Sequence, residues 1–451
     1  MVDDPTNTPI EKQAKTMNRW IIVLGGILIQ LALGAIYAWS AFTTPLQGAE
    51  GSASEFAFSK TETQAIFSAG LLTFAIFTII GGRLQNKYGS MKIALSGGIL
   101  LGLGYILASF VGASFVPKLL CIGIIAGAGI GLAYVVPIAV GVKWFPDKKG
   151  LVSGLAVAGF GFGAFIWILL ANPPSILGFS GLITKQAGMY TIENVDAAFR
   201  LYGIMFLILV GIGSLVMRNP PAGWKPAGWN PPTVDPKNKN IGYNCKPREM
   251  CRKKEFYLLW MMFIIGALAG LMVIGNVQNF AKSPTDGFLA YGFSPTETTD
   301  FAVLGAAICL PIFNGAGRIV WGQVSDRIGR RKALLSMFLF QAIMMIVFFY
   351  TTANPYAFYI VAALIGFNFG GNFALFPAAC ADSFGAGNLG LNYGFIFTAY
   401  GIGGTVGPLL AGAVQDAGMS FLYAFIPAAV MCFVAAGLAV IYRDSVQGKT
   451  A

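Results

Sequence analysis

Long apolar stretches alternate with short polar ones along most of the chain. About twenty consecutive apolar residues form a helix long enough to cross a bilayer. About twelve such stretches are present. The predicted spans are 20–42, 61–82, 92–112, 119–143, 150–171, 199–217, 256–280, 299–322, 333–351, 356–380, 390–413 and 420–442. The pattern predicts an all-α polytopic membrane protein with twelve transmembrane helices.

Composition and charge agree with this prediction. Hydrophobic residues make up 56% and charged residues 11% of the 451 residues, whereas soluble domains carry roughly a quarter charged residues. The net charge of +11 would suggest a nucleic-acid partner in a soluble protein. Here the basic residues gather in alternate loops, so we expect a lipid bilayer around the chain and no nucleic acid. By the positive-inside rule both termini and the middle loop are cytoplasmic, as in a prokaryotic inner-membrane protein.

Residues suited to catalysis or metal binding are scarce. The sequence has no histidine, which is the commonest metal ligand and the usual proton shuttle near neutral pH. Its 6 cysteines match no metal-binding spacing. The sequence also lacks a G-x-S-x-G nucleophile motif. We therefore expect no metal, no cofactor and no enzymatic activity.

A proline- and glycine-rich stretch divides the chain. From Pro220 it reads P-P-A-G-W-K-P-A-G-W-N-P-P, which cannot continue a helix. We predict a first six-span half at 1–217, a cytoplasmic linker loop at 218–255 and a second six-span half at 256–451.

The two halves look like copies of one another. Gly82 and Gly89 are matched by Gly322 and Gly329 at an offset of 240 residues. The same offset pairs Trp20 with Trp260, Pro137 with Pro377, Gly150 with Gly390 and Gly161 with Gly401. One register that holds this far indicates an internal duplication. Parallel repeats place a substrate site between the halves, near the middle of the membrane.

A lone arginine, Arg318, lies near the end of the eighth predicted span. An arginine inside a membrane costs on the order of 3 kcal/mol and normally faces a cavity or a partner. The equivalent position of the first half is Thr78, so the arginine is not part of the duplicated scaffold. Guanidinium binds carboxylate through two parallel hydrogen bonds, so Arg318 suits a carboxylate ligand. The alternative is that Arg318 extends to the cytoplasm, because Gly322 is only about 6 Å further along the helix.

The loop that follows Arg318 resembles the signature loop of the major facilitator superfamily. The residues that carry the resemblance are Gly322, Asp326, Arg327, Gly329, Arg330 and Arg331, with Gly82, Asn86 and Gly89 in the first half. In that family the acidic residue and the arginines form a cytoplasmic latch between the halves, which implies the same role here. Asn86 replaces the aspartate, so we expect a weaker latch in the first half. A simple basic turn at the membrane surface is the alternative.

A second stretch is more specific. Residues 144–159 read W-F-P-D-K-K-G-L-V-S-G-L-A-V-A-G, and glycines follow at 161 and 163. This looks like the signature that opens the fifth helix in the oxalate:formate antiporter family, and the related monocarboxylate transporters share its outline. The motifs at 37–39 and 392–394 extend the resemblance. It implies the major facilitator fold, with two six-helix pseudo-repeats, and a carrier of small carboxylates.

The resemblance also implies a binding site. In the monocarboxylate transporters an arginine on the eighth helix holds the substrate carboxylate, and Arg318 stands at the matching place. Polar residues within apolar spans would complete the site, although each one alone equally suits a bond between helices. They are Tyr37, Tyr134, Asn276, Asn368, Asn372 and Tyr400, with Gln30 as a weaker candidate.

The number of positive charges predicted for the binding site limits the charge of the substrate. The oxalate carrier has a lysine on its eleventh helix where this chain has Tyr400, so the second positive charge expected for a dianion is missing. We expect a monomeric secondary transporter of small monocarboxylates, such as lactate, pyruvate or formate, that works by alternating access. An oxalate/formate exchanger and a carboxylate sensor with a transporter fold remain the alternatives.

The sequence leaves the coupling mode open. No carboxylate is predicted deep inside a span, since Glu62, Glu297 and Asp300 stand at outer helix starts and Asp382 at an inner end. A buried carboxylate would have indicated a proton relay. The options are anion exchange, uptake of the acid with its proton, and a peripheral acid among Glu297 and Asp300. Acids at helix N-termini are usually ordinary caps, which weakens the last option.

Overall fold

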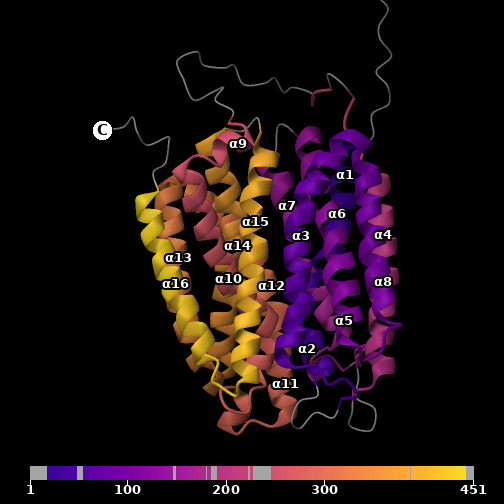
Figure 1. Cartoon of the computed structure of the whole chain (residues 1–451), viewed down its shortest axis with the longest axis vertical. Helices are drawn as coiled ribbons and strands as arrows, with labels where there is room; N and C mark the ends of the chain where they lie inside the picture. The colour runs from indigo at the N-terminus through magenta and orange to yellow at the C-terminus, as the bar shows by residue number, and fades with distance from the viewer. Residues whose placement is uncertain are drawn as a thin grey trace, which may run out of the picture.

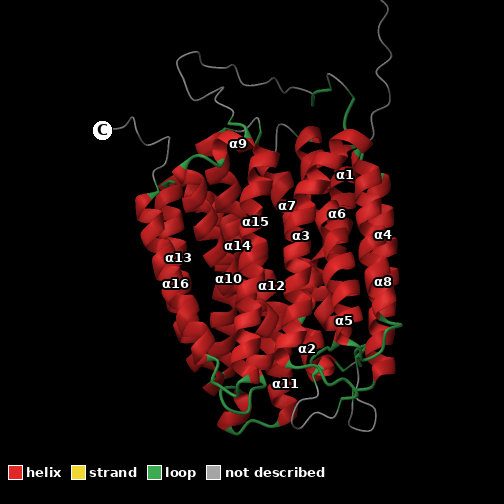
Figure 2. Ribbon diagram, in the orientation of Figure 1, coloured by secondary structure: helices red, strands yellow, loops and turns green. Residues whose placement is uncertain are grey.

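The number of membrane-spanning helices predicted from hydropathy is confirmed. In the computed structural model 12 helices are long and apolar enough to cross a membrane, so the chain is an integral membrane protein. The structure describes residues 18–47, 54–145, 149–178, 180–183, 190–221, 224–226, 245–385 and 388–442. Within these ranges the chain forms helices and loops and no strand, and the helices of the two halves stand side by side (Figures 1 and 2).

Several membrane spans combine an α-helix with a tighter or wider helical turn. The first half contains α1 (Arg19–Leu33), η1 (Gly34–Ala38), α2 (Ser40–Leu46), α3 (Lys60–Tyr88), α4 (Ser90–Ala108), α5 (Phe115–Lys118), η2 (Leu119–Ala126), α6 (Gly127–Trp144), α7 (Lys149–Ala171), η3 (Ser175–Leu177) and α8 (Ile192–Leu215). The second half contains α9 (Pro247–Met250), α10 (Lys254–Ala281), η4 (Phe288–Tyr291), α11 (Pro295–Leu304), η5 (Gly305–Cys309), α12 (Leu310–Ile328), α13 (Arg330–Phe349), η6 (Tyr350–Ala353), α14 (Pro355–Phe384), α15 (Leu389–Asp416) and α16 (Leu422–Ile441).

Several helices are longer than their predicted spans, because polar residues continue the helix beyond its apolar part. α3 ends at Tyr88 and α12 at Ile328, not at residues 82 and 322, and α8 begins at Ile192, not at residue 199. The chain turns from α3 into α4 at Gly89, and from α12 into α13 at Gly329. The φ angles of 91° and 87° at these positions favour glycine. The expected loop around Gly322 is therefore helical, and the turn is a single glycine.

The boundary between the halves is formed by α3 and α7 on one side and by α15 and α12 on the other. Figure 1 shows the first half in indigo to magenta and the second in orange to yellow. We call the end of the bundle that carries α9 the linker end, and the end that carries α2 and α11 the far end (Figure 1).

The halves are joined at the far end by carboxylates that cap helix starts in the opposite half. The Asp416 carboxylate at the end of α15 accepts hydrogen bonds from the backbone N–H groups of Lys60 (2.9 Å) and Thr61 (2.7 Å) at the start of α3. Asp300 of α11 likewise accepts from the Ser175 backbone N–H (2.7 Å) and from the Ser175 hydroxyl. A carboxylate at a helix start satisfies free N–H groups and complements the helix dipole. These bonds keep the halves together at the far end.

The first half also contains a buried ion pair near the far-end starts of two of its spans. The Lys118 ammonium lies 2.6 Å from the Asp196 carboxylate and 2.9 Å from the Ala108 carbonyl oxygen, and the aromatic rings of Phe56 and Phe199 flank it. Lys118 is 0% and Asp196 5% exposed. The sequence analysis did not single out Asp196, which is the fifth residue of α8 and so stands near a helix start, like the other acids it named. It was missed because α8 starts earlier than its apolar stretch.

We expect Asp196→Asn to destabilise the protein strongly, because it leaves the Lys118 charge buried without its partner. Breaking one side of a buried ion pair typically costs about 3–5 kcal/mol. Thermal unfolding of the detergent-solubilised protein measures the effect. A Lys118→Met and Asp196→Leu double variant is the matched control, and it should recover much of the loss. A single variant as stable as the unaltered protein would show that the pair is not important for stability.

Candidate functional site

Arg318 lies inside the bundle and contacts both halves. It stands ten residues before the end of α12, which is about 15 Å along the helix, and its residue is 7% exposed. Its Nε donates to Asn314 Oδ1 one turn earlier (2.9 Å), and its Nη1 donates to the Val157 carbonyl oxygen of α7 (3.0 Å). Its Nη2 has no hydrogen-bond partner among the described residues. The alternative in which Arg318 extends to the membrane surface does not fit this geometry.

An aromatic ring of the second half packs against the guanidinium. Its central carbon lies 4.2 Å from the ring centroid of Phe373 on α14, a cation–π contact. α14 can approach α12 this closely because Gly370 has no side chain. A Cβ atom there would collide with the Asn314 carbonyl oxygen and crowd the Arg318 backbone nitrogen. The arginine is therefore fixed by helices of both halves.

Two tyrosines join the halves next to this arginine. The hydroxyl groups of Tyr37 and Tyr400 are 2.9 Å apart, and both residues are buried. Tyr37 lies in η1, the 3-10 turn that interrupts the first span, and Tyr400 lies in α15. The sequence predicted both tyrosines for the site, and the structure brings them together.

A cluster of aromatic rings surrounds the tyrosine pair. Tyr134 packs within it, with its ring centroid 5.0 Å from Phe74 and 5.5 Å from Phe160. The rings in mutual contact are those of Tyr37, Phe74, Tyr134, Phe160, Phe263, Phe369, Phe373, Phe397 and Tyr400. The cluster draws on both halves, and it makes the surroundings of the guanidinium largely apolar.

A small cavity adjoins the site on its far-end side. Its volume is about 10 Å³, and its lining residues are Tyr37, Ala164, Ile274, Ala306, Leu310, Pro311 and Asn314. A space of this size holds about one water molecule. Ala306 belongs to η5, a π-helical turn, and such turns are frequent at functional sites. The halves are therefore closed around the site in this conformation.

The asparagines predicted for the site donate hydrogen bonds within the second half in this conformation. Asn368 points to α13, where its Nδ2 donates to the Met337 carbonyl oxygen (2.7 Å) and to Gln341 Oε1 (3.0 Å). Asn276 and Asn372 donate to carbonyl oxygens of their own helices, at Met272 and Phe369. The structure thus brings Tyr37, Tyr134 and Tyr400 around the aromatic cluster, whereas these asparagines bond within the second half.

The weaker candidate, Gln30, also bonds between helices. Its Nε2 donates to the Tyr134 carbonyl oxygen at 2.9 Å, which ties α1 to α6. The partners that hold Arg318, namely the Val157 carbonyl and the Phe373 ring, were not predicted. A carbonyl contact leaves no mark in the sequence, and one phenylalanine among 37 is not distinctive.

A comparison with known proteins identifies the family. The chain matches the Major Facilitator Superfamily over residues 22–297 and 287–450. This chain belongs to the major facilitator superfamily.

Relatives of this superfamily member include several carriers. It is 30% identical over 425 residues to the oxalate:formate antiporter of Oxalobacter formigenes, which covers 94% of this chain and 91% of that protein. It is 28% identical over 459 residues to the apicoplast pyruvate carrier 1 of Toxoplasma gondii, covering 86% and 82% of the two chains. It is 25% identical over 440 residues to monocarboxylate transporter 12 of Xenopus laevis, covering 93% and 88%. The resemblance found in the sequence is confirmed.

The superfamily signature loop of the second half forms a charge cluster around Arg330. Arg330 contacts Asp326 (2.6 Å), Asp382 (2.8 Å) and the Ser325 hydroxyl. These partners belong to α12 and α14, so the cluster ties three helices of the same half. Arg327 is exposed and Arg331 half-buried beside it. These contacts of Arg330 lie within the second half, and the latch between the halves stays a prediction.

The first half does not repeat this ion pair at the equivalent positions. At the offset of 240 residues, Asp326 and Arg330 correspond to Asn86 and Ser90, and Asn86 is exposed. Gly82 stays within α3 and Gly89 makes the turn, as Gly322 and Gly329 do in the second half.

The linker is attached to the same half. The Cys245 backbone N–H donates to the Phe384 carbonyl oxygen (2.9 Å), and its carbonyl oxygen accepts from the side-chain amides of Asn388 (3.2 Å) and Asn392 (2.9 Å). Asn392 opens one of the motifs that resembled the oxalate carrier family, so in this superfamily member it anchors the linker.

We expect the tyrosine pair to be energetically coupled. Tyr37→Phe or Tyr400→Phe removes one hydroxyl and leaves the other buried without its partner, at a cost of about 1–3 kcal/mol. The double variant removes both hydroxyls and should be destabilised by less than the sum of the single effects. A double-mutant cycle of thermal unfolding measures this coupling. Strictly additive effects would contradict it.

Proposed function

We propose that this protein carries small monocarboxylates across the membrane by alternating access, and that Arg318 holds the substrate carboxylate. The observation that carries the proposal is the buried guanidinium, whose Nη2 has no partner among the described residues while Nε and Nη1 are fixed. A desolvated cation without an acidic partner favours an anionic ligand. The carboxylate named for the oxalate:formate antiporter, the pyruvate carrier and the monocarboxylate transporter supports the same ligand class.

The balance of buried charge supports a singly charged substrate. Among the described residues the buried charged side chains are Lys118, Asp196 and Arg318. Lys118 pairs with Asp196, so a single positive charge remains to be neutralised. The tyrosine at position 400 supplies a hydroxyl and no second charge. One carboxylate balances the site, whereas oxalate would leave a buried negative charge.

The surroundings of Arg318 support a small substrate. The aromatic rings that pack around Arg318 leave few polar groups and little room beside the guanidinium. Lactate, pyruvate and formate combine one carboxylate with at most a short chain, and they suit such a site. Oxalate/formate exchange is the alternative substrate pattern.

The peripheral acids offer little support for a proton relay. Glu297 forms a capping box with Ser294 at the start of α11, and Asp300 bonds to Ser175 of the other half. Both are engaged at the far end and distant in sequence from Arg318. We therefore favour anion exchange or uptake of the acid with its proton over a relay through these residues.

The proposed arrangement in the cell follows from the loop charges. The linker end, with both termini, would face the cytoplasm of a prokaryotic inner membrane, because the basic loops lie there. Each monomer would contain a complete site, because residues of both halves of one chain surround Arg318.

We expect Arg318→Ala and Arg318→Lys to abolish carboxylate uptake. Lysine keeps the charge but cannot reproduce the three directions in which the guanidinium bonds. Loss of a desolvated charge-assisted bond of about 3 kcal/mol corresponds to a fall of about a hundredfold or more in transport efficiency. Uptake of radiolabelled lactate, pyruvate, formate and oxalate into proteoliposomes measures the effect. Undiminished uptake by a variant inserted at normal levels would rule out the role of Arg318.

A pH gradient separates the coupling modes in the same assay. Uptake of the acid with its proton should be driven by an inward proton gradient, whereas exchange should require carboxylate inside the vesicle and respond little to pH. Ligand-dependent thermal stabilisation without any flux would instead favour the carboxylate sensor.

A further inference from the structure

A strip of buried polar side chains continues from the cavity towards the far end. On the first span Ser40 and Thr43 follow the cavity-lining Tyr37 at intervals of three residues, which keeps them on one helix face. On α10 Gln278 follows the cavity-lining Ile274 one turn later, and Asn279 stands beside it. The strip therefore draws on both halves.

A hydrogen bond across the halves holds the strip closed. The Thr43 hydroxyl lies 2.9 Å from Asn279 Oδ1 and 2.8 Å from the Ser40 carbonyl oxygen. All of these residues are buried, with Asn279 the most exposed at 8%. The bond thus joins the first span to α10 in the part of the boundary that Asp416 and Asp300 cover at the far end.

The strip contains donors that the protein does not use. Gln278 Nε2, Asn279 Nδ2 and the Ser40 hydroxyl have no hydrogen-bond partner among the described residues, although all are buried. Most buried polar groups are paired, so unpaired ones indicate a ligand or water in another conformation. The unpaired amide nitrogens can only donate, which suits an anion.

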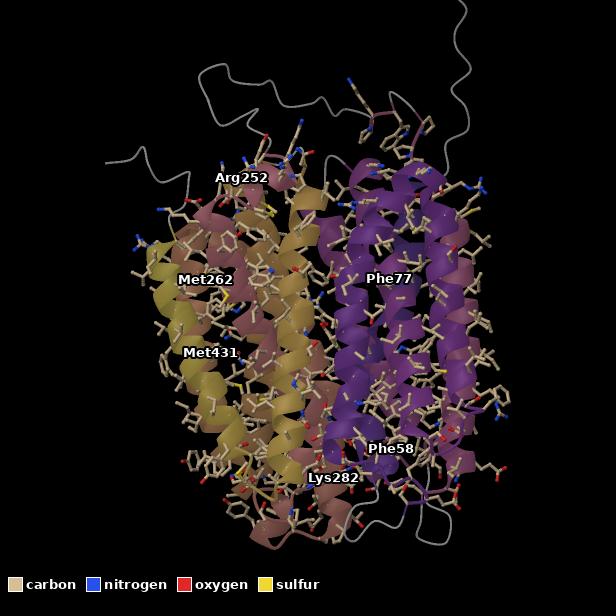
Figure 3. The ribbon with its side chains drawn as sticks, viewed as in Figure 1. Phe58, Phe77, Arg252, Met262, Lys282 and Met431 are labelled. Carbon is tan, nitrogen blue, oxygen red and sulfur yellow. The ribbon has the colours of Figure 1, made fainter. Side chains whose placement is uncertain are left out.

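A lysine, Lys282, lies on the far-end side of these donors. Lys282, one turn after Gln278, donates from its ammonium to Gln278 Oε1 at 3.2 Å. Figure 3 labels Lys282 at the far end, near the boundary between the halves. This bond directs Gln278 Oε1 towards Lys282, and it leaves Gln278 Nε2 available to donate to a ligand. Lys282 also supplies a positive charge that attracts anions from solution.

We propose that Gln278, Asn279 and Ser40, with Lys282 behind them, form an outer carboxylate site through which the substrate passes between the far end and Arg318. The inference rests on the proposed function, and it adds a second, weaker site on the route. When the halves part at the far end, the Thr43 to Asn279 bond breaks and the amide donors meet the incoming carboxylate. Neutral donors bind a carboxylate less strongly than a guanidinium does, so the anion moves on to Arg318.

The test measures separately how fast the substrate reaches Arg318 and how tightly the Arg318 site binds it. Gln278→Leu, Asn279→Leu and the double variant remove the donors and keep side chains of similar size. Each single variant should lower kcat/KM for uptake into right-side-out membrane vesicles about three- to tenfold, the value expected for one hydrogen bond. The probes are radiolabelled pyruvate and formate. The dissociation constants of both anions, measured by ligand-dependent thermal stabilisation, should stay within about twofold, because the Arg318 site is unchanged.

Gln341→Leu is the matched control. Gln341 is an equally buried amide on α13, whose Oε1 accepts one hydrogen bond and whose Nε2 has no partner among the described residues. It lies away from the strip, so uptake should be unaffected. Each replacement removes an unpaired buried nitrogen together with the one hydrogen bond that the amide oxygen accepts, so the gain and the loss offset one another and we expect all of these variants to fold. Lys282→Gln gives an independent measurement, because it should weaken the dependence of uptake on ionic strength.

The outcomes distinguish the two proposals. Normal kcat/KM in the double variant, with the unaltered protein transporting pyruvate or formate, would overturn the outer site and leave the proposed function intact. An equal loss of affinity and of uptake would also overturn it, because the residues would then act through the central site. If the unaltered protein neither binds nor moves either anion, the proposed function fails and the outer site fails with it.

Discussion

The structure depends on one arginine that is buried inside the membrane span without an acidic partner. A desolvated guanidinium is unfavourable unless its N–H groups are satisfied and its charge is balanced. The protein meets the first demand only in part, through Asn314, the Val157 carbonyl and the Phe373 ring. The remaining nitrogen and the whole of the charge are left to something that the protein does not supply. The carboxylate that we propose as substrate would meet both demands.

The duplication of the halves and the asymmetry of the site are linked. The repeated glycines produce the same turns and close helix approaches in both halves, which makes a symmetric scaffold. The charges break that symmetry: the Lys118 and Asp196 pair occurs in the first half, and Arg318 and the Arg330 cluster occur in the second. Under the proposed function, a substrate between the halves would meet positive charge on the second half alone, so that binding to one half and closure by the other would be separate events.

Hydropathy and motifs predicted the fold and drew attention to Arg318, which is buried, but they could not predict the contacts around it. Twelve spans and the duplicated register follow from periodicity alone, because the bilayer imposes length and apolarity. Arg318 was conspicuous because an isolated charge in an apolar run is rare. Asn368 could not be distinguished from a ligand residue, since its bond to Gln341 depends on how α13 packs. Asp196 was hidden because polar residues continue α8 beyond its apolar stretch, and the ends of helices are where hydropathy is least informative.

The caps that join the halves at the far end have a consequence for the speed of opening. Asp416 and Asp300 bond to backbone N–H groups and to a hydroxyl, and neither bond pairs two charged side chains. When such a contact separates at the membrane surface, water replaces each partner almost evenly, and a net loss of only about 0.5–1.5 kcal/mol per bond remains. If ion pairs in an apolar boundary held the halves together at the far end, opening would have to separate two charges at once. Hydrogen bonds at helix caps can instead break one at a time, because a water molecule can take the place of each lost partner.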